Sequence, residues 1–339
     1  MIRKLFPFSI FIMAFNVKAM LPLPSKAEIP KDNLQSVEKI NLGKTLYFDP
    51  RLSKNGTVSC NTCHNVMLGG DDQRSVSVGV EGQKGGRSAP TVWNSAFHTV
   101  QFWDGRAKSL EEQAVGPITN PIEMGMSDFD LVIKRLSQIP GYVLMFDNVF
   151  GKNGISKENI GKAIASFERT LISGNSEFDK YMHGNKKAIS AQKIRGMKLV
   201  QEIGCTACHS GVNFNGENLK MGEGNFQKFP VVENDFIKKY NLSADLGRFN
   251  VTKNEDDKNM WRVPTWRNIA ITAPYFHNGA VRTLDEAVRV MAKSQLDMNL
   301  KDDQVKDIVA FLESLTGTFP RINMPRLPES TSTTVLDLE

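Results

Sequence analysis

Residues Cys60–His64 read CNTCH and residues Cys205–His209 read CTACH, two copies of the pattern C-x-x-C-H. Two thiols at this spacing can each form a thioether with one vinyl group of the same porphyrin, and the adjacent imidazole then reaches the iron. All four cysteines fall in these pairs, so none is left for a disulfide framework. Zinc is the alternative, but its usual spacing does not put histidine directly after the second cysteine in both copies. We therefore expect two covalently attached haems c, held by Cys60, Cys63, Cys205 and Cys208, with His64 and His209 as axial ligands.

The sequence around the two motifs repeats as well. Residues 89–94 (APTVWN) resemble residues 263–268 (VPTWRN), and fifteen residues after each proline a glycine closes an aromatic cluster, at Gly105 and Gly279. This register is too long to arise by chance, so the chain contains two copies of one haem-binding module. The second copy carries an additional polar segment at about 213–258, which we expect to form an excursion on the surface.

Apolar periodicity and capping residues predict several helices. Two of them follow Ser109 and Thr283, each with a glutamate three residues later, as in a capping box. Others are expected at about 128–138 after Ser127, 157–172 after Ser156, 191–203 and 302–315. No stretch alternates regularly enough to predict a sheet.

These patterns predict a mostly α fold, and the 40% of apolar residues suffice for two cores. We expect two tandem class I cytochrome c-like haem domains with long loops around the cofactors. The predicted division is an N-terminal domain at 20–180, a C-terminal domain at 181–320 and a flexible tail at 321–339.

The first nineteen residues have the composition of an export signal. A basic start at Arg3 and Lys4 precedes an apolar run, Leu5–Phe15, and the residues that follow suit a signal peptidase. The run is too short to cross a bilayer, although an uncleaved membrane anchor is the alternative. We therefore predict a cleaved signal peptide at 1–19 and a periplasmic protein.

The formal net charge of +5 overstates the basic character of the mature chain. Arg3, Lys4 and Lys18 lie in the predicted signal peptide, which leaves +2 on the rest. Two haems would add four propionates and bring the protein near neutrality. The composition therefore gives no support for nucleic acid as a partner.

With these motifs in place, the chain resembles the bacterial di-haem cytochrome c peroxidases from about residue 37 to 320. Further segments that carry the resemblance are 101–106 (QFWDGR), 121–125 (PIEMG) and 273–279 (APYFHNG). The resemblance implies that the N-terminal haem reduces hydrogen peroxide to water. It also implies a high-potential C-terminal haem, which accepts electrons from a small donor, a monohaem cytochrome c or a copper protein, and a possible homodimer.

The resemblance also implies roles for particular residues. It places the acid–base carboxylate on Glu123 and a peroxide-binding amide beside it on Gln113. Trp103 matches a tryptophan that couples the two haems electronically. Met291 matches the sixth ligand of the C-terminal iron, with His277 as a second choice. Without the resemblance, a solvated acid, a core aromatic and a packed methionine are the simpler interpretations.

The sequence departs from the family pattern in ways that predict an open first haem. Pro117, which cannot ligate iron, stands at the repeat position of Met291. In many relatives a histidine blocks the peroxide iron until the other haem is reduced, and Val80 takes its place here. We therefore expect a five-coordinate or water-bound haem that admits peroxide without prior reduction, unless His98 swings in as a ligand.

Most members of the family bind calcium between the haems. The matching ligands here are the carbonyls of Thr272 and Pro274, whereas Ser88 replaces the expected asparagine side chain. Backbone carbonyls and water can still coordinate calcium, so the resemblance implies a weakened site.

Two other functions remain open at the level of sequence. One is a protein-modifying oxidase, as in the di-haem enzyme that matures the cofactor of methylamine dehydrogenase. That enzyme also lacks the blocking histidine but has tyrosine at the position of Met291. The other is a non-catalytic electron carrier, against which Glu123 and the open haem argue.

Overall fold

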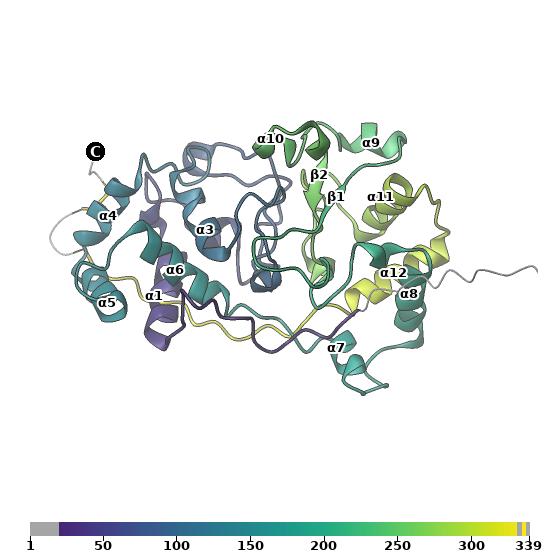
Figure 1. Cartoon of the computed structure of the whole chain (residues 1–339), viewed down its shortest axis with the longest axis horizontal. Coiled ribbons are helices and arrows are strands. Elements are labelled where there is room, and N and C mark those ends of the chain that lie inside the picture. The colour runs from purple at the N-terminus through teal and green to yellow at the C-terminus, as the bar shows by residue number, and fades with distance from the viewer. Residues whose placement is uncertain (1–19, 331–333, 337–339) are drawn as a thin grey trace, which may run out of the picture.

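A computed structural model describes residues 20–330 and 334–336, so the predicted signal peptide lies outside the described residues. The chain forms two mostly helical lobes that lie end to end (Figure 1). The predicted mostly α class is confirmed. Among the described helices, none is both long and apolar enough to cross a membrane.

The core of the N-terminal lobe is built around two crossing helices, α1 (Val37–Phe48) and α6 (Lys157–Glu168). Helices α3 (Leu110–Val115), α4 (Phe129–Ser137) and α5 (Pro140–Phe150) complete the lobe. Helices α1 and α6 approach closely because Gly43 has no side chain. A Cβ there would lie 1.8 Å from the carbonyl oxygen of Ala163.

The C-terminal lobe repeats this arrangement. Helices α8 (Ala191–Glu202) and α12 (Asp302–Glu313) pack together, and Gly196 meets the carbonyl of Asp307 in the same way, with 1.9 Å left for a Cβ. Helices α7 (Glu177–Met182) and α11 (Leu284–Leu296) flank the pair. The internal duplication therefore extends to helix pairs that lie outside the repeated motifs.

The helix predictions are confirmed in location but not in every cap. Helix α4 begins after Asp128 rather than Ser127, and the Asp128 carboxylate accepts from the backbone N–H of Leu131. In the two predicted capping boxes, the hydrogen bond to the Ser or Thr hydroxyl forms, but the return bond to the Glu side chain does not. Glu112 accepts from the N–H of Lys108, and Glu286 accepts from the Tyr240 hydroxyl, because each carboxylate finds a partner outside its own cap.

The polar segment 213–258 lies largely at the surface, as we predicted, but it is also folded and anchored to the C-terminal lobe. It carries α9 (Asp235–Tyr240), α10 (Phe249–Thr252) and the strand β1 (Phe226–Lys228), which pairs antiparallel with β2 (Met260–Arg262) in a small unpredicted sheet. Some of its apolar side chains, Phe229, Ile237 and Leu242, are buried against α11 and the loop before it. These few apolar residues determine where the segment lies, because each of them packs against the C-terminal lobe.

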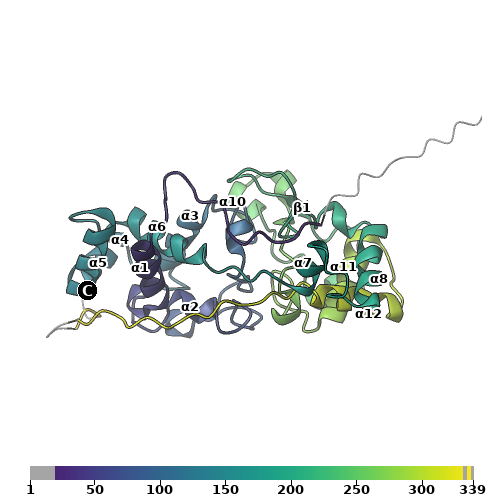
Figure 2. The ribbon, with the colours of Figure 1, turned by 90° about the horizontal axis from the view of Figure 1, so that it is seen from below.

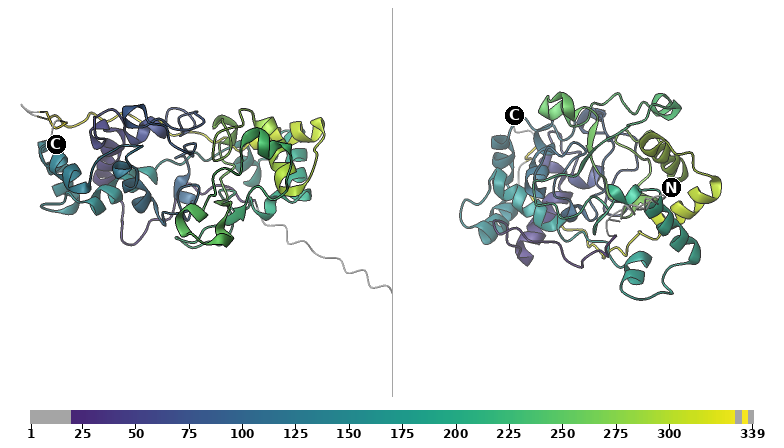
Figure 3. Two further views of the ribbon diagram at one scale, coloured as in Figure 1. Left: turned by 90° about the horizontal axis from the view of Figure 1, so that it is seen from above. Right: turned by 45° about the vertical axis from the view of Figure 1, so that its right-hand side comes forward.

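Each end of the described chain packs on the far lobe. Met20 belongs to the core of the C-terminal lobe. Phe319 lies against Trp93 of the N-terminal lobe with ring centroids 4.8 Å apart, and Val335 is buried in the same core. The segment after Phe319 runs back along the N-terminal lobe (Figures 2 and 3). The domain limits at 180 and 320 stay a prediction, and both ends tie the lobes together.

Candidate redox centres

The first C-x-x-C-H motif opens onto a chamber of about 420 Å³ in the N-terminal lobe. Its cysteines lie on the short helix α2 (Cys60–Cys63), and His64 follows at the end of that helix. The Nδ1 of His64 lies 2.9 Å from the carbonyl oxygen of Pro90, to which it must donate. This bond leaves Nε2 without a proton and free to bind a metal. Burial lowers the pKa of His64, which favours the neutral ring that ligation requires.

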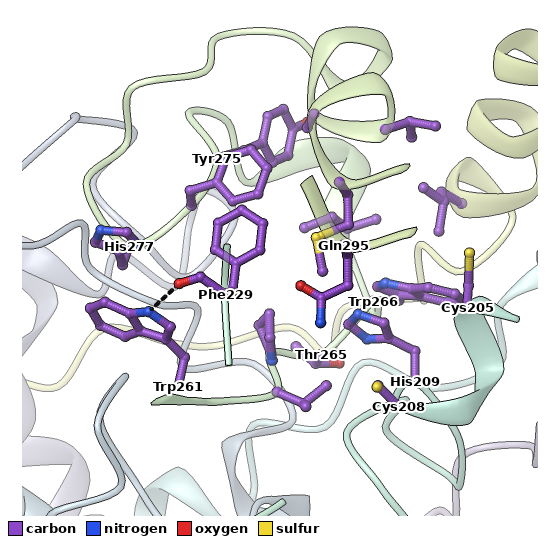
Figure 4. Close-up of a pocket in the computed structure, with 18 of the residues that line it drawn as sticks. Cys205, Cys208, His209, Phe229, Trp261, Thr265, Trp266, Tyr275, His277 and Gln295 are labelled. Atoms are coloured by element: carbon purple, nitrogen blue, oxygen red, sulfur yellow. Dashed lines mark hydrogen bonds between the residues drawn. The ribbon is translucent and has the colours of Figure 1, made fainter. Parts of the chain in front are cut away.

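The second motif opens onto a chamber of about 260 Å³ in the C-terminal lobe. The Nδ1 of His209 donates to the carbonyl oxygen of Phe214 at 3.0 Å, and burial lowers the pKa of the ring to about 4. Trp266 stacks on this ring with centroids 4.4 Å apart (Figure 4). The two histidines are therefore oriented in the same way, by backbone carbonyls of their own lobes.

Both chambers fit a covalently attached haem. The four cysteines form no disulfide, and each pair lines the same chamber as its histidine. Zinc fits poorly, because the described residues contain no group of three or more His, Cys, Asp or Glu side chains that could hold a metal ion. Each chamber thus supplies two thiols and one neutral imidazole, the donor set of a c-type haem.

The two chambers differ in the residues that face His64 and His209. Met291 of α11 lines the chamber of His209, whereas Pro117 lines the chamber of His64. His277, the second choice as a ligand, is stacked on Trp261 with centroids 4.1 Å apart, and Figure 4 shows this pair on the opposite side of the chamber from His209. The structure thus brings Met291 and His209 to one chamber, as the sequence predicted.

Glu123 and Gln113 both line the N-terminal chamber. Burial raises the pKa of Glu123, and the nearby Arg106 guanidinium opposes this shift. The backbone fixes the position of the carboxyl group, because the N–H of Glu123 donates to the carbonyl of Asn120 at 3.1 Å and its carbonyl accepts from the N–H of Val80 at 2.9 Å. A carboxyl group with a raised pKa is suited to accept and return a proton.

Val80 does not face the chamber. Its side chain is 1% exposed and belongs to the core of the N-terminal lobe. The loop before it lies tight against the Glu123 segment, since a Cβ on Gly79 would fall 1.9 Å from the carbonyl of Ile122. His98 does line both chambers, but its ring is 4% exposed and is held by contacts with Arg262 and Asn215.

Trp103 lies between the two chambers and lines both. Its indole N–H donates to the carbonyl of Ser88 at 2.8 Å, and its own carbonyl accepts from the backbone N–H of Arg262 at 2.9 Å. These two bonds attach the ring to one segment of each repeat. An aromatic side chain fixed in this position can couple two redox centres.

The predicted calcium ligands Ser88, Thr272 and Pro274 line the C-terminal chamber. The sequence analysis missed Asp71, which lines it too. Asp71 is 3% exposed, its Oδ1 has no hydrogen-bond partner among the described residues, and burial raises its pKa to about 7. Nothing in the local sequence marks this aspartate, because only the fold brings it to the second motif.

The sequence analysis also missed Arg262, which lines both chambers. A signal was present. Arg262 directly precedes the repeated VPTWRN segment and therefore corresponds to Ser88 of the first copy, which lines both chambers as well.

The protein has two chambers with a C-x-x-C-H motif each, and the aromatic side chain of Trp103 lies between them. This arrangement defines a di-haem c-type redox protein. The comparisons with known proteins agree. The family described as di-haem cytochrome c peroxidase matches residues 37–187, and the cytochrome c family matches residues 194–316.

Several relatives are similar over most of their length. The cytochrome c551 peroxidase of Pseudomonas aeruginosa is 44% identical, over 92% of this chain and 88% of its own. That of Nitrosomonas europaea is 43% identical, also over 92% and 88%. The methylamine utilization protein MauG of Methylorubrum extorquens is 36% identical, again over 92% and 88%. A solved MauG-like protein associated with microbial copper homeostasis has a TM-score of 0.76 at 29% identity, over 87% of this chain and 93% of that chain.

The chain belongs to the di-haem cytochrome c peroxidase family. It is accordingly an oxidoreductase of the cytochrome c peroxidase type, and its cofactors are two haems c. The prediction of a peroxidase rather than a protein-modifying oxidase is confirmed, since the MauG relatives are less similar.

Proposed function

We propose that hydrogen peroxide reacts in the N-terminal chamber and that the C-terminal chamber passes electrons to it. The bound haems supply one-electron chemistry at iron, so the assignment rests on the protein around them. The observation that carries it is the difference between Met291, beside His209, and Pro117, beside His64. A thioether fills a coordination position and raises the potential, whereas proline leaves the position to substrate.

In this proposal Gln113 and Glu123 handle peroxide and its protons. The Gln113 amide holds peroxide by hydrogen bonds. The Glu123 carboxylate takes the proton from the peroxide oxygen nearer the iron and delivers it to the other peroxide oxygen. The O–O bond breaks, and the doubly protonated oxygen leaves as water. Two electrons and two protons then complete the reduction of one peroxide to two waters. The half-buried position of Glu123 supports this role, because the loss of water holds its pKa above the usual value.

We further propose that Trp103 couples the two haems. Its support is its place in the wall of both chambers and the hydrogen bonds that fix it to Ser88 and Arg262. The electrons would come from a small donor protein, a monohaem cytochrome c or a copper protein. Export to the periplasm behind the 1–19 signal, and assembly as a homodimer, belong to the same proposal.

Calcium binding is proposed at Thr272, Pro274 and Ser88, with Asp71 as an additional ligand. The hydroxyl of Ser88 points to the carbonyl of Arg74 at 3.5 Å, so it replaces an asparagine poorly. The unpartnered carboxylate oxygen of Asp71 offers the charge that the site otherwise lacks. Calcium titration followed by calorimetry tests this, and Asp71→Asn is expected to weaken binding at least tenfold. Equal affinity in the two proteins would exclude Asp71 as a ligand.

The open first haem is tested by stopped-flow mixing with peroxide. The holoprotein is used in two states, fully oxidised and with only the high-potential haem reduced. Because Val80 is buried away from the chamber, we expect peroxide to react in both states. An oxidised protein that shows two low-spin haems and reacts only after half-reduction would overturn the proposal.

A further inference from the structure

A buried cation lies between the two chambers. Arg262, at the end of β2, is 4% exposed and contributes to the walls of both chambers. Its hydrogen-bond partners are uncharged: the carbonyl of Phe102 at 3.0 Å, the carbonyl of Val263 at 3.4 Å and the ring of His98 at 2.7 Å. A guanidinium in this position has lost its water without gaining an anion.

Within the described part of the chain, no carboxylate is hydrogen-bonded or ion-paired to Arg262. Asp104 acts on Arg262 only through space, because its carboxylate is already bonded to Arg87 at 2.5 Å and to Arg106 at 2.9 Å. Burial lowers the pKa of Arg262 to about 10, so the side chain is still charged at neutral pH. A buried charge of this kind costs free energy, and a counter-ion that reaches it lowers that cost.

Two neighbours of Arg262, the His98 ring and the Asn215 amide, can also donate hydrogen bonds. The Nδ1 of His98 accepts from the Nη1 of Arg262 at 2.7 Å, and the same Nη1 lies 3.2 Å from Nε2; the Asn215 amide nitrogen lies 2.7 Å from Nδ1. An acceptor role at Nδ1 puts the proton of the neutral ring on Nε2. Burial and the charge of Arg262 hold the pKa of His98 well below its usual range, so the ring is not a second cation. His98, Asn215 and Arg262, here called the donor cluster, carry one net positive charge.

We propose that Arg262 and His98 of the donor cluster, which both line the two chambers, bind haem propionate carboxylates and that Arg262 is the counter-ion shared by the two haems. The inference rests on the two bound haems of the proposed function. Arg262 faces both chambers, and a guanidinium matches a carboxylate with two parallel hydrogen bonds. A cation next to a haem favours the reduced iron, so Arg262 raises the potential. Ser88, at the same position of the first repeat, carries no charge, so this cation is a feature of the second copy alone.

The test uses the full-length holoprotein and measures the mid-point potential of each haem between pH 6 and pH 9, roughly the range that brackets an uncompensated buried carboxyl group. In Arg262→Gln we expect at least one potential to fall and to become dependent on pH. The reason is that a propionate without its cation takes up a proton when the iron is reduced. Arg262→Lys, which keeps the charge, is expected to restore a potential independent of pH.

The matched control is Arg135→Gln. Arg135 is also buried, but it donates to the carbonyls of Arg51, Ser53 and Lys54 and lines neither chamber. We expect this control to lose stability and to keep both potentials. A merely structural role of Arg262 would make the two glutamine variants behave alike and would overturn the inference.

A measurement of haem content distinguishes a failure of this inference from a failure of the proposed function. A wild-type chain with fewer than two haems would contradict the proposed function itself. Two haems with unchanged potentials in Arg262→Gln would overturn only the inference. If that variant does not fold, the wild-type protein still decides, because its propionate-bending resonance Raman bands must shift in D2O when N–H groups bind them. Added acetate at constant ionic strength should leave the potentials unchanged, and a shift would assign the cluster to a free carboxylate instead.

Discussion

At the scale of single residues, a few side chains make the two lobes of this protein chemically different. His64 and His209 are held by backbone carbonyls in the same way, so the difference between the chambers does not arise from the motif histidines. It arises from Met291 on one side and from Pro117 with Glu123 on the other. The local geometry is shared by the repeats, and in the proposed function these different side chains give the two chambers different roles.

Replacing Glu123 by Gln is expected to lower the rate of peroxide reduction by about 100-fold or more, because the variant cannot carry a proton between the two oxygens. Haem content and thermal stability should change little. Gln113→Glu is not a suitable control. The control is Glu112→Gln, an exposed glutamate next to Gln113 on α3. A Glu123→Gln variant with a wild-type rate would remove the carboxylate from the mechanism.

The pH dependence of the same reaction has a definite sign. Burial raises the pKa of Glu123 above 4.5, and the catalytic form is the carboxylate. Activity should therefore be full above the raised pKa and decline as the pH falls through it. The acid limb of kcat/KM for peroxide is expected above pH 4.5 in the wild type and absent in Glu123→Gln. An acid limb at or below the ordinary glutamate pKa would contradict the burial argument.

At the scale of elements, the same contact recurs in the two lobes. A glycine in the helix before each motif meets a backbone carbonyl of the last helix of its repeat, Gly43 with Ala163 and Gly196 with Asp307. Since no side chain fits between them, these contacts fix how closely α1 meets α6 and how closely α8 meets α12. Val200 of α8 and Ile308 and Leu312 of α12 line the C-terminal chamber, and Glu168 of α6 lines the N-terminal chamber.

Gly43→Ala is expected to destabilise the protein by about 1–3 kcal/mol, because the new methyl group must displace a helix backbone. Alanine is otherwise the better helix former by about 1 kcal/mol, so the sign of the change is informative. The control is Asn41→Ala, an exposed position on the same helix, where a small gain is expected. Urea denaturation measures both, and a stabilised Gly43→Ala would show that α1 and α6 can separate at little cost.

At the scale of the whole molecule, the chain ends hold the two lobes together. The N-terminal segment packs on the C-terminal lobe through Met20, and Phe319 lies on the N-terminal core against Trp93. Arg87 adds a link across the molecule, because it binds both Asp104 and Asp245 of the polar segment. The walls shared by the two chambers depend on this arrangement.

Phe319→Ala is expected to cost about 3 kcal/mol of unfolding free energy, the usual loss for a truncated aromatic ring in a packed site. The matched control is Met324→Ala, an exposed position in the same segment, with a change near zero. Haem absorbance during denaturation should show that the N-terminal haem environment is lost at lower urea concentration in Phe319→Ala. Equal stability of the two variants would mean that the segment after Phe319 does not support the N-terminal lobe.

The sequence by itself determined the chemistry that is local along the chain. Two thiols and a histidine within five residues predict a haem wherever they fold. The repeat register predicted two similar lobes and placed Pro117 at the position of Met291, which the family resemblance had singled out. The helices at 157–168 and 302–313 were also predictable, because their apolar positions recur with the period of a helix. These features need no partner from distant parts of the chain.

Only the tertiary structure decided which distant residues share a chamber wall. Asp71 has no local pattern, and the repeat position of Arg262 does not show that it is buried; the fold places both where an unpaired oxygen or an unpaired charge is costly. The anchoring of the polar segment 213–258 was missed for the same reason, since a few apolar residues among many polar ones do not show in sequence what they will pack against. Burial is a property of the assembled chain, and it converts ordinary side chains into parts of a site.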